Sequence, residues 1–474
     1  MKEEKMLFNT PQFVFFFIAV ICLWYILPTN LRKILLLITS YIFAYLLGGI
    51  STIVVIFFIT VLTYFAGLSM SKCNNKKGIL FGFIAATIAV LVYGKYLTYM
   101  LNVFNSSFNT SISISVVSMV GVSYYVFSAI SYMVDVYKGE EADRNFIDVA
   151  VWISFFAKII AGPIERHRDF KQQLVHIRDS RFDFEPIKRG LLICSLGYFY
   201  KIVIADRLSI IVDFVYANLY DYAGITLFVV MVLYSLQIYF DFCGYSLIAY
   251  GVALTMNIRI TSNFNHPYFA DSISDFWRRW HISLSSWLKD YLYIPLGGNR
   301  KGKLRQKINI MITFLISGIW HGAGLNYLVW GGLHGLFQII ERGLGFRNKV
   351  SKTVNVVITF LLVSFAWIFF RADSIKTALV FVKRMFCWNP WVITDGTLFN
   401  LGLDIYDQRV LIIALIIAFA IEFAQYKNIS IYNQLQKHSI VIRWFVYYAI
   451  IASIVVYGKY GVTFDANNFI YFKY

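Results

Sequence analysis

Long apolar segments alternate with short polar ones along most of this chain. A helix needs about 20 mainly apolar residues to cross a bilayer, and we predict eleven or twelve such helices. The candidate segments are 11–28, 34–49, 51–70, 79–101, 114–135, 190–213, 224–256, 308–320, 325–341, 353–370, 409–425 and 440–458. Among these, 224–256 is long enough to bend or break. The separate segment 147–163 ends in Gly-Pro and is expected to be re-entrant.

The composition supports an all-α polytopic membrane protein. Apolar residues make up 59% of the 474 residues and charged residues 15%, against roughly 45–50% and 25% in an ordinary globular protein. A soluble protein of this composition could not cover its apolar surface with polar residues. Because the chain has no internal repeat and no polar linker, we expect one membrane domain over residues 1–474.

The positive charges are concentrated in two loops. The chain has 43 Lys and Arg against 26 Asp and Glu, a formal net charge of +17. Loop 164–189 carries seven basic residues and loop 257–307 carries nine, whereas 102–113 and 214–223 carry none. Basic loops tend to stay in the cytoplasm, so we expect these two loops inside and the N-terminus outside. The same excess can bind an anionic lipid surface or an anionic substrate.

The segment between Ser272 and Pro295 has the pattern of one amphipathic helix. Its apolar stripe recurs at steps of three and four residues and consists of Trp277, Trp280, Leu284, Trp287, Leu288 and Tyr291. Tryptophans with neighbouring arginines are typical of an interfacial anchor, which is one interpretation. His281, next to Trp280, favours a functional site, because an anchor has no need of an imidazole.

A second histidine, His321, interrupts the apolar stretch 317–335 and is flanked by glycines. Glycines let helices approach closely or break where they line a cavity, so we expect a helix break here. An ionisable residue inside a span is a functional candidate, and a mostly neutral imidazole suits a general base. A structural histidine between helices is the alternative, and for His334 it is the stronger expectation.

Residues 297–307 form a glycine-rich basic segment that follows the tryptophan stripe. Together with the preceding arginines it makes a basic patch that suits a phosphorylated ligand. Retention of the loop in the cytoplasm is the plainer alternative, and both can hold. The residues expected to bind the ligand are Arg278, Arg279, Asn299, Arg300, Lys301 and Lys303.

Two further features are candidates for function. Asp241 lies inside an apolar run, so we expect it to face a cavity or a polar partner. The terminal FIYFKY (469–474) is either an aromatic anchor or a mobile element. No metal site is predicted, because the histidines have no carboxylate or thiolate partner nearby in sequence. The chain also lacks nucleophile-elbow, P-loop and dinucleotide motifs, and nothing in it predicts nucleic-acid binding.

Several blocks of the sequence resemble the membrane-bound O-acyltransferase (MBOAT) family. They are most similar to its bacterial alginate O-acetyltransferase branch, and the resemblance runs from about residue 120 to the end. The blocks are DFCGYS, NFNHPYFADSISDFWRRWHISLSSWLKDYLYIPLGGNR, GIWHGAGLNYLVWGGLHG, GPIERHRDF (162–170), FAWIFFRAD (365–373) and FIYFKY.

The resemblance implies a fold and a set of site residues. The fold is a ring of tilted helices, with re-entrant and interfacial helices, around a central tunnel. The catalytic core is 110–345, with His321 as the catalytic base and His281 as the second histidine. Trp280, Trp320 and Asp241 are expected among the substrate-binding residues. The C-terminal tail, 459–474, resembles the aromatic motif of the small partner in teichoic acid D-alanylation. Tyr471 is therefore a candidate acyl relay, although the final Tyr474 leaves open which tyrosine matters.

The implied function is transfer of acetyl from cytoplasmic acetyl-CoA, across a bacterial cell membrane, to an extracytoplasmic polysaccharide or peptidoglycan. Acetyl-CoA is the donor substrate, no cofactor is tightly bound, and an SGNH-type acetyltransferase outside the membrane is the expected partner. D-alanyl transfer to teichoic acid is one alternative. A transporter of an anionic solute or lipid, with His321 and Asp241 in its pathway, is another; no symmetry between halves supports it.

Overall fold

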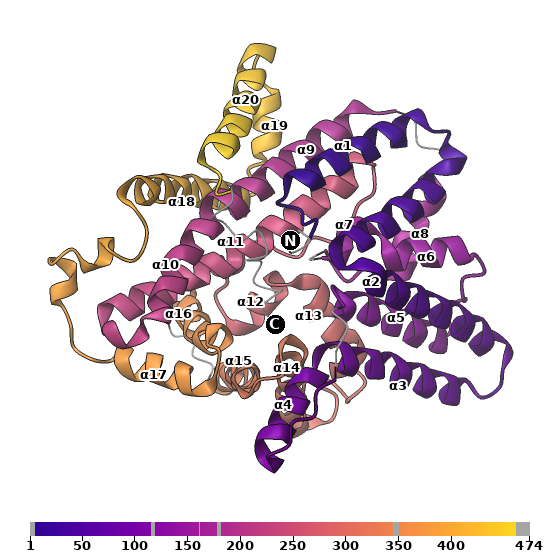
Figure 1. Ribbon diagram of the computed structural model, residues 1–474, viewed down its shortest axis with the longest axis horizontal. Coiled ribbons are helices and arrows are strands. Elements are labelled where there is room, and N and C mark those ends of the chain that lie inside the picture. Colours follow the sequence, from indigo (N-terminus) through magenta and orange to yellow (C-terminus); the bar gives the residue numbers. More distant parts are fainter. Residues whose placement is uncertain (1–4, 115–118, 161, 178–181, 345–349, 461–474) are drawn as a thin grey trace. The chain divides into compact units, whose positions relative to one another are not determined.

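The computed structural model describes residues 5–114, 119–160, 162–177, 182–344 and 350–460. These residues form helices, and no strand occurs among them. The chain divides into two compact units, Met1–Leu191 with Ala249–Thr261, and Leu192–Ile248 with Ser262–Tyr474. The helices are labelled in Figure 1.

The first unit is built around one long, kinked helix, α2. Its helices are α1 (Pro11–Ile26), α2 (Arg32–Lys72), α3 (Lys76–Lys95), α4 (Leu97–Phe108), α5 (Val122–Tyr137), α6 (Phe146–Ser154), α7 (Phe156–Ile159) and α8 (His167–His176). The backbone of α2 leaves the helical conformation at Gly48 and Gly49, and Gly49 has a φ of +71°. Glycine adopts positive φ without steric cost, so the predicted segments 34–49 and 51–70 join at a kink. The α5 and α6 helices pack on α2.

The second unit contains the histidines singled out above. Its elements are α9 (Phe184–Tyr198) with the π-helical turn η3 (Phe199–Ala205), α10 (Asp206–Ala217), α11 (Ile225–Thr255), α12 (Ile273–Arg279), α13 (Ile282–Leu288) with the π-helical turn η6 (Lys289–Tyr293), α14 (Gly302–His321), α15 (Leu325–Leu344), α16 (Lys352–Arg371), α17 (Ile375–Met385), α18 (Ile405–Tyr426), α19 (Ile431–Gln436) and α20 (Ile440–Tyr457). The α9 and α11 helices contribute residues to both units. The α11 helix is continuous over 31 residues, so the break considered for 224–256 does not occur.

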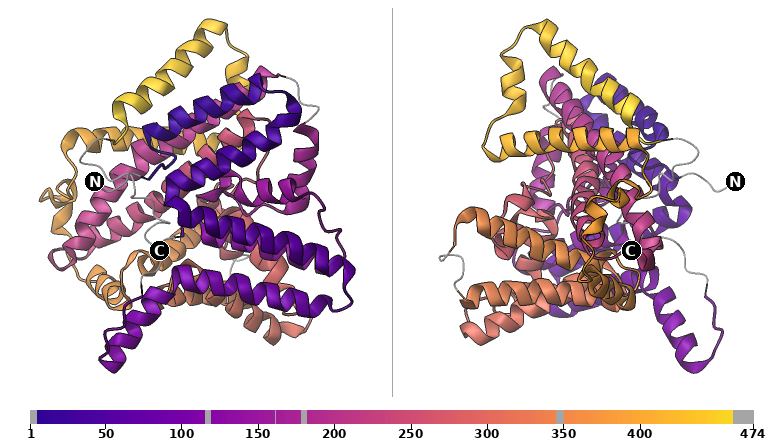
Figure 2. Two further views of the ribbon diagram at one scale, coloured as in Figure 1. Left: turned by 45° about the vertical axis from the view of Figure 1, so that its right-hand side comes forward. Right: turned by 90° about the vertical axis from the view of Figure 1, so that its left-hand side faces the viewer.

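The closest helix packing of the second unit joins α14 to α15, which lie side by side (Figure 2). Glycines make this contact possible. A Cβ atom at Gly318 would lie 2.4 Å from the carbonyl oxygen of Tyr327, and one at Gly331 would lie 2.3 Å from that of Phe314. Any side chain at either position would push the two backbones apart.

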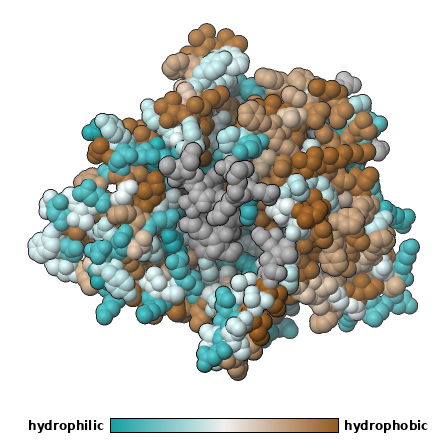
Figure 3. Space-filling model, in the orientation of Figure 1, coloured by the Kyte–Doolittle hydropathy of each residue, from teal (hydrophilic) through white to brown (hydrophobic). Residues whose placement is uncertain are grey.

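Six helices in the described part of the chain are long and apolar enough to cross a membrane. They are Thr29–Lys72, Lys76–Lys95, Ile225–Thr255, Lys352–Arg371, Ile405–Tyr426 and Ile440–Tyr457. Because the first contains two predicted segments, these six account for seven of the predicted spans, and the others fall on shorter or more polar helices. Many Phe, Ile and Val side chains are exposed along these helices, and hydrophobic surface is extensive in Figure 3. An all-helical, multi-pass membrane protein is therefore confirmed.

Candidate active site

His321 is the last residue of α14 and is buried among aromatic rings. Its ring centroid lies 4.6 Å from that of Trp320, 4.9 Å from that of Trp330 in α15, and 5.3 Å from that of Phe370 in α16. The next residue, Gly322, has an extended backbone. The helix break expected at this histidine is therefore confirmed, and three helices supply its surroundings.

The single helix predicted between Ser272 and Pro295 is wrong. Two short helices, α12 and α13, replace it, because His281 between them has a φ of +43°. A left-handed residue cannot continue a right-handed helix, and this conformation costs a non-glycine residue roughly 1–2 kcal/mol. The tryptophans of the stripe are buried in this unit, with Trp277 at 8%, Trp280 at 2% and Trp287 at 7% exposure. Burial excludes their role as an exposed interfacial anchor.

The backbone around His281 is held by Asn263. The N–H of Ile282 donates to the carbonyl oxygen of Asn263 at 2.9 Å, and the Ser283 hydroxyl donates to its Oδ1 at 2.7 Å. The His281 ring is fully buried and contacts Phe242 of α11, with 4.8 Å between centroids. Burial lowers the pKa of His281 to about 3, because a charged imidazole would lose its hydration. The ring is therefore neutral at physiological pH.

Trp320 connects the two predicted catalytic histidines. Its ring centroid lies 6.0 Å from that of His281 and 4.6 Å from that of His321. The structure thus brings together two residues that are 40 positions apart in the sequence. Trp280 instead packs on Trp367 of α16, with 5.1 Å between the ring centroids.

His334, for which a structural role was expected, belongs to the same aromatic cluster. It is fully buried in α15, and its Nδ1 accepts a hydrogen bond of 3.2 Å from Nε1 of Trp277. In a neutral ring the proton then sits on Nε2. The ring of Trp330 lies between His334 and His321, with 5.2 Å and 4.9 Å between the ring centroids. The four-residue step from Trp330 to His334 on one helix face is the sequence signal for this neighbourhood.

A cavity of about 580 Å³ lies beside this cluster and is partly cationic. Its lining consists of Ser274, Trp277, Arg278, Ile282, Ser285, Ser286, Lys289, Tyr293, Ile310, Thr313, Phe314, Gln338 and Arg342. Two of these side chains, Trp277 and Phe314, also contact the ring of His334. The cavity wall and the histidine cluster therefore share residues.

Sequence reasoning found only part of the cationic lining. Arg278, one of the predicted ligand-binding residues, lines the cavity, and so do Lys289 and Arg342, which the sequence analysis did not single out. Arg342 follows His334 by eight residues, which places the two near the same face of α15. That spacing is the signal that could have revealed it.

The other predicted basic residues lie elsewhere. Arg279 is paired with Asp275 of its own helix, with Nε to Oδ2 at 2.8 Å. The remaining predicted ligand-binding residues of this segment are exposed and do not line the cavity; they are Asn299, Arg300, Lys301 and Lys303.

Asp241 has a polar partner, which was one of its two expected settings. Its Oδ1 lies 2.7 Å from Nζ of Lys201, which also lies 2.8 Å from Asp206. All three side chains are at most 2% exposed. The next residue in α11 is Phe242, which contacts His281. Asp241 therefore anchors the part of α11 that packs on the second histidine.

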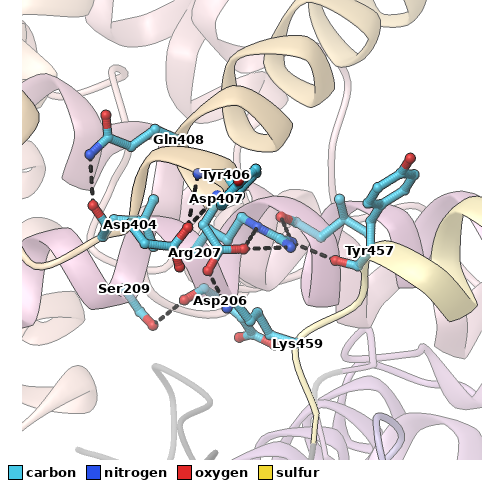
Figure 4. Close-up of polar contacts among 11 residues, drawn as sticks. Asp206, Arg207, Ser209, Asp404, Tyr406, Asp407, Gln408, Tyr457 and Lys459 are labelled. Carbon is cyan, nitrogen blue, oxygen red and sulfur yellow. Dashed lines mark hydrogen bonds and ion pairs between the residues drawn. The ribbon is translucent and has the colours of Figure 1, made fainter.

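A second group of charges joins α10, α18 and the residue that ends α20 (Figure 4). Arg207 donates to Asp407 at 3.0 Å and to the carbonyl oxygen of Tyr457 at 2.6 Å. Lys459 also pairs with Asp407. These contacts hold residues 457–459. The predicted relay residues Tyr471 and Tyr474 lie outside the described residues.

Six apolar helices define a multi-pass membrane protein, and its candidate active site is a histidine cluster beside a cationic cavity. The model of the membrane-bound O-acyltransferase family matches residues 110–371, and the chain belongs to this family. A probable alginate O-acetylase of Pseudomonas putida is 36% identical over 404 residues, covering 82% of both chains.

Two other relatives carry different names. A peptidoglycan O-acetyltransferase of Helicobacter pylori is 34% identical over 423 residues, or 80% of both chains. A teichoic acid D-alanyltransferase of Bacillus subtilis is 27% identical over 277 residues, which cover 54% of this chain and 69% of that one. The predicted family is confirmed, and the protein is an O-acyltransferase rather than a transporter.

Proposed function

We propose that this protein transfers acetyl from acetyl-CoA on the cytoplasmic side of a bacterial cell membrane to an extracytoplasmic polysaccharide or peptidoglycan. One observation carries the proposal: Trp277 both lines the cationic cavity and hydrogen-bonds to His334 in the histidine cluster. A donor bound in this cavity would lie next to the histidines. The names of the relatives support an acetyl donor and a polymer acceptor.

The cationic cavity is the proposed donor site. Coenzyme A carries phosphates, and charge-assisted hydrogen bonds from Lys and Arg are strong phosphate contacts. Arg278, Lys289 and Arg342 line the cavity together with serine hydroxyls. We therefore assign the phosphate contacts to Arg278, Lys289 and Arg342. The exposed Arg300, Lys301 and Lys303, expected from the sequence, do not line the cavity.

His321 is the proposed general base. It takes the proton from the acceptor hydroxyl as the new C–O bond forms to the acetyl carbonyl carbon. The C–S bond of the thioester then breaks, and the proton returns to the sulfur to give free coenzyme A. Such acid–base help contributes about 10²–10⁴-fold. His281 is neutral, so its single N–H can donate to the thioester oxygen, where negative charge develops.

The first acceptor in this scheme is the hydroxyl of Tyr471. Its ester is then consumed by an SGNH-type transferase outside the membrane, which passes acetyl to the polymer. Direct attack by a sugar hydroxyl is the simpler scheme. The contacts of Arg207 and Lys459 fix where the tail begins.

The proposal is tested with purified protein in phosphatidylcholine nanodiscs. We expect release of coenzyme A thiol from acetyl-CoA and transfer of labelled acetyl to protein or polymer. D-alanyl transfer is the second candidate, favoured by the Bacillus subtilis relative. Inactivity with acetyl-CoA, together with activity on a D-alanyl thioester of a carrier protein, would select that alternative and overturn the proposal.

A further inference from the structure

A second cavity, of about 500 Å³, has an almost entirely apolar lining within the second unit. Its walls come from residues 266–269 and from α11, α16 and α18, three of the helices that are long and apolar enough to cross the membrane. Ile416 and Phe419 of α18 line it and are 65% and 62% exposed. Since these side chains belong to a membrane-crossing helix, the cavity opens toward lipid. It shares no lining residue with the cationic cavity.

One wall of this apolar cavity carries a histidine–glutamate pair. Nδ1 of His266 lies 2.6 Å from Oε2 of Glu422, and the Tyr200 hydroxyl donates to Oε1 at 2.9 Å. The two side chains of the pair are 15% and 10% exposed. A carboxylate on Nδ1 orients an imidazole and leaves Nε2 for a ligand, as in other carboxylate–histidine pairs. His266 also has a φ of +48°, an uncommon backbone conformation that clusters at functional sites.

The charge of the pair favours a neutral ligand group. The Glu422 carboxylate already contacts the polar groups of His266, Tyr200 and Tyr239, so no further cation is needed to satisfy it. An anionic phosphate beside this carboxylate would be repelled, and burying an ammonium costs more than burying a hydroxyl. In a neutral His266 ring whose Nδ1–H donates to Glu422, Nε2 is left as an acceptor. The matching group is a hydroxyl.

The position of the pair along α18 fits a lipid alcohol. Glu422 lies four residues before the end of α18 at Tyr426, or about 6 Å at 1.5 Å per residue. The hydroxyl would therefore lie near the membrane interface, and the chain would extend along Leu415 and Ile416 toward the middle of the helix. The cavity volume is within the usual range for a single small ligand.

We propose that this cavity binds one alkyl chain of a hydroxyl-bearing membrane lipid, with its hydroxyl on Nε2 of His266. The site is separate from the cationic cavity, and it does not depend on the proposed acetyl transfer.

The test uses the full chain in phosphatidylcholine nanodiscs and a hexadecanol that carries a diazirine in its chain. We expect saturable photolabelling of peptides from α11 or α18 that excess hexadecanol competes away. The matching methyl ether has lost the donor and should label at least fivefold less. Equal labelling by the alcohol and the ether would overturn the proposal.

Variants locate the site. His266→Asn keeps a residue type that tolerates positive φ but removes the imidazole, and it should reduce labelling by the alcohol to the level of the ether. Leu415→Trp fills the cavity and should abolish labelling by both probes. The matched control is Ile413→Trp, an exposed position of the same helix that does not line the cavity. Unchanged labelling in Leu415→Trp, or equal loss in Ile413→Trp, would show that the lipid binds elsewhere.

Discussion

The indole N–H of Trp277 donates to Nδ1 of His334 across 3.2 Å, and this bond joins the cationic cavity to the histidine cluster. Trp277 comes from α12 and His334 from α15, so the contact depends on how these helices pack. Ring contacts then lead from His334 through Trp330 to His321. Changes at the cavity wall should therefore affect His321, the proposed base.

The first prediction concerns this bond. Trp277→Phe keeps an aromatic ring but leaves a buried acceptor without its donor, which costs about 1–3 kcal/mol. We expect a lower midpoint of thermal unfolding and slower thiol release. Trp388→Phe, at a position that is 85% exposed, is the control and should change neither. An unaltered midpoint in Trp277→Phe would mean that the bond contributes little.

Replacement of His321 should abolish catalysis without loss of folding. His321→Ala removes the proposed base, and we expect thiol release to fall by about 10²–10⁴-fold while membrane insertion is normal. His438→Ala is the matched control, because His438 is exposed. Retention of wild-type activity in His321→Ala would refute the assignment.

The cationic cavity makes a prediction about donor affinity. Lys289→Ala and Arg342→Ala each remove a proposed phosphate ligand, and each should raise KM for acetyl-CoA about tenfold, which corresponds to about 1.4 kcal/mol. Lys301→Ala, exposed and outside the cavity, should have little effect. The opposite ranking would place the donor on the glycine-rich segment instead.

Acid should destabilise the protein through His281. Its pKa is about 3 in the folded state and near 6.5 when unfolded, so the unfolded state binds more protons between these values. Stability from this group is complete above about pH 6.5 and is lost as pH falls toward 3. At pH 4.5 we expect a loss of about 3 kcal/mol, measured by thermal unfolding. His281→Asn should show a smaller loss between pH 7 and 4.5 than wild type or His438→Asn does; equal losses would contradict a buried neutral ring.

The relay makes the last prediction. Tyr471→Phe removes the hydroxyl that would carry acetyl, so polymer acetylation in cells should be abolished, whereas Tyr474→Phe should leave it intact. Mass spectrometry of the intact C-terminal peptide provides the second measurement: the mass of an acetyl group on Tyr471, which Tyr471→Phe should lack. Normal acetylation in Tyr471→Phe would leave the terminal segment as an anchor only.

The local pattern of residues in the sequence was sufficient to predict several features of this protein. The length of the apolar segments predicted a helical multi-pass membrane protein, because bilayer thickness sets a minimum span. The glycines around His321 predicted the helix break that α14 shows. The blocks around residues 272–335 were specific enough to predict the family.

Other features depended on contacts between residues far apart in the chain. The helical period of the tryptophan stripe gave no sign that the backbone leaves the right-handed helical conformation at His281. Asn263, nearly 20 residues earlier in the chain, holds that turn. Likewise the partner of Asp241 is Lys201, 40 residues away. Helix packing decides such contacts. Sequence pattern was therefore enough to predict the membrane-spanning helical class and the family, and to single out His281 and His321 as candidates. Which tryptophans and cations lie near these histidines depends on helix packing, so it emerged only from the folded structure.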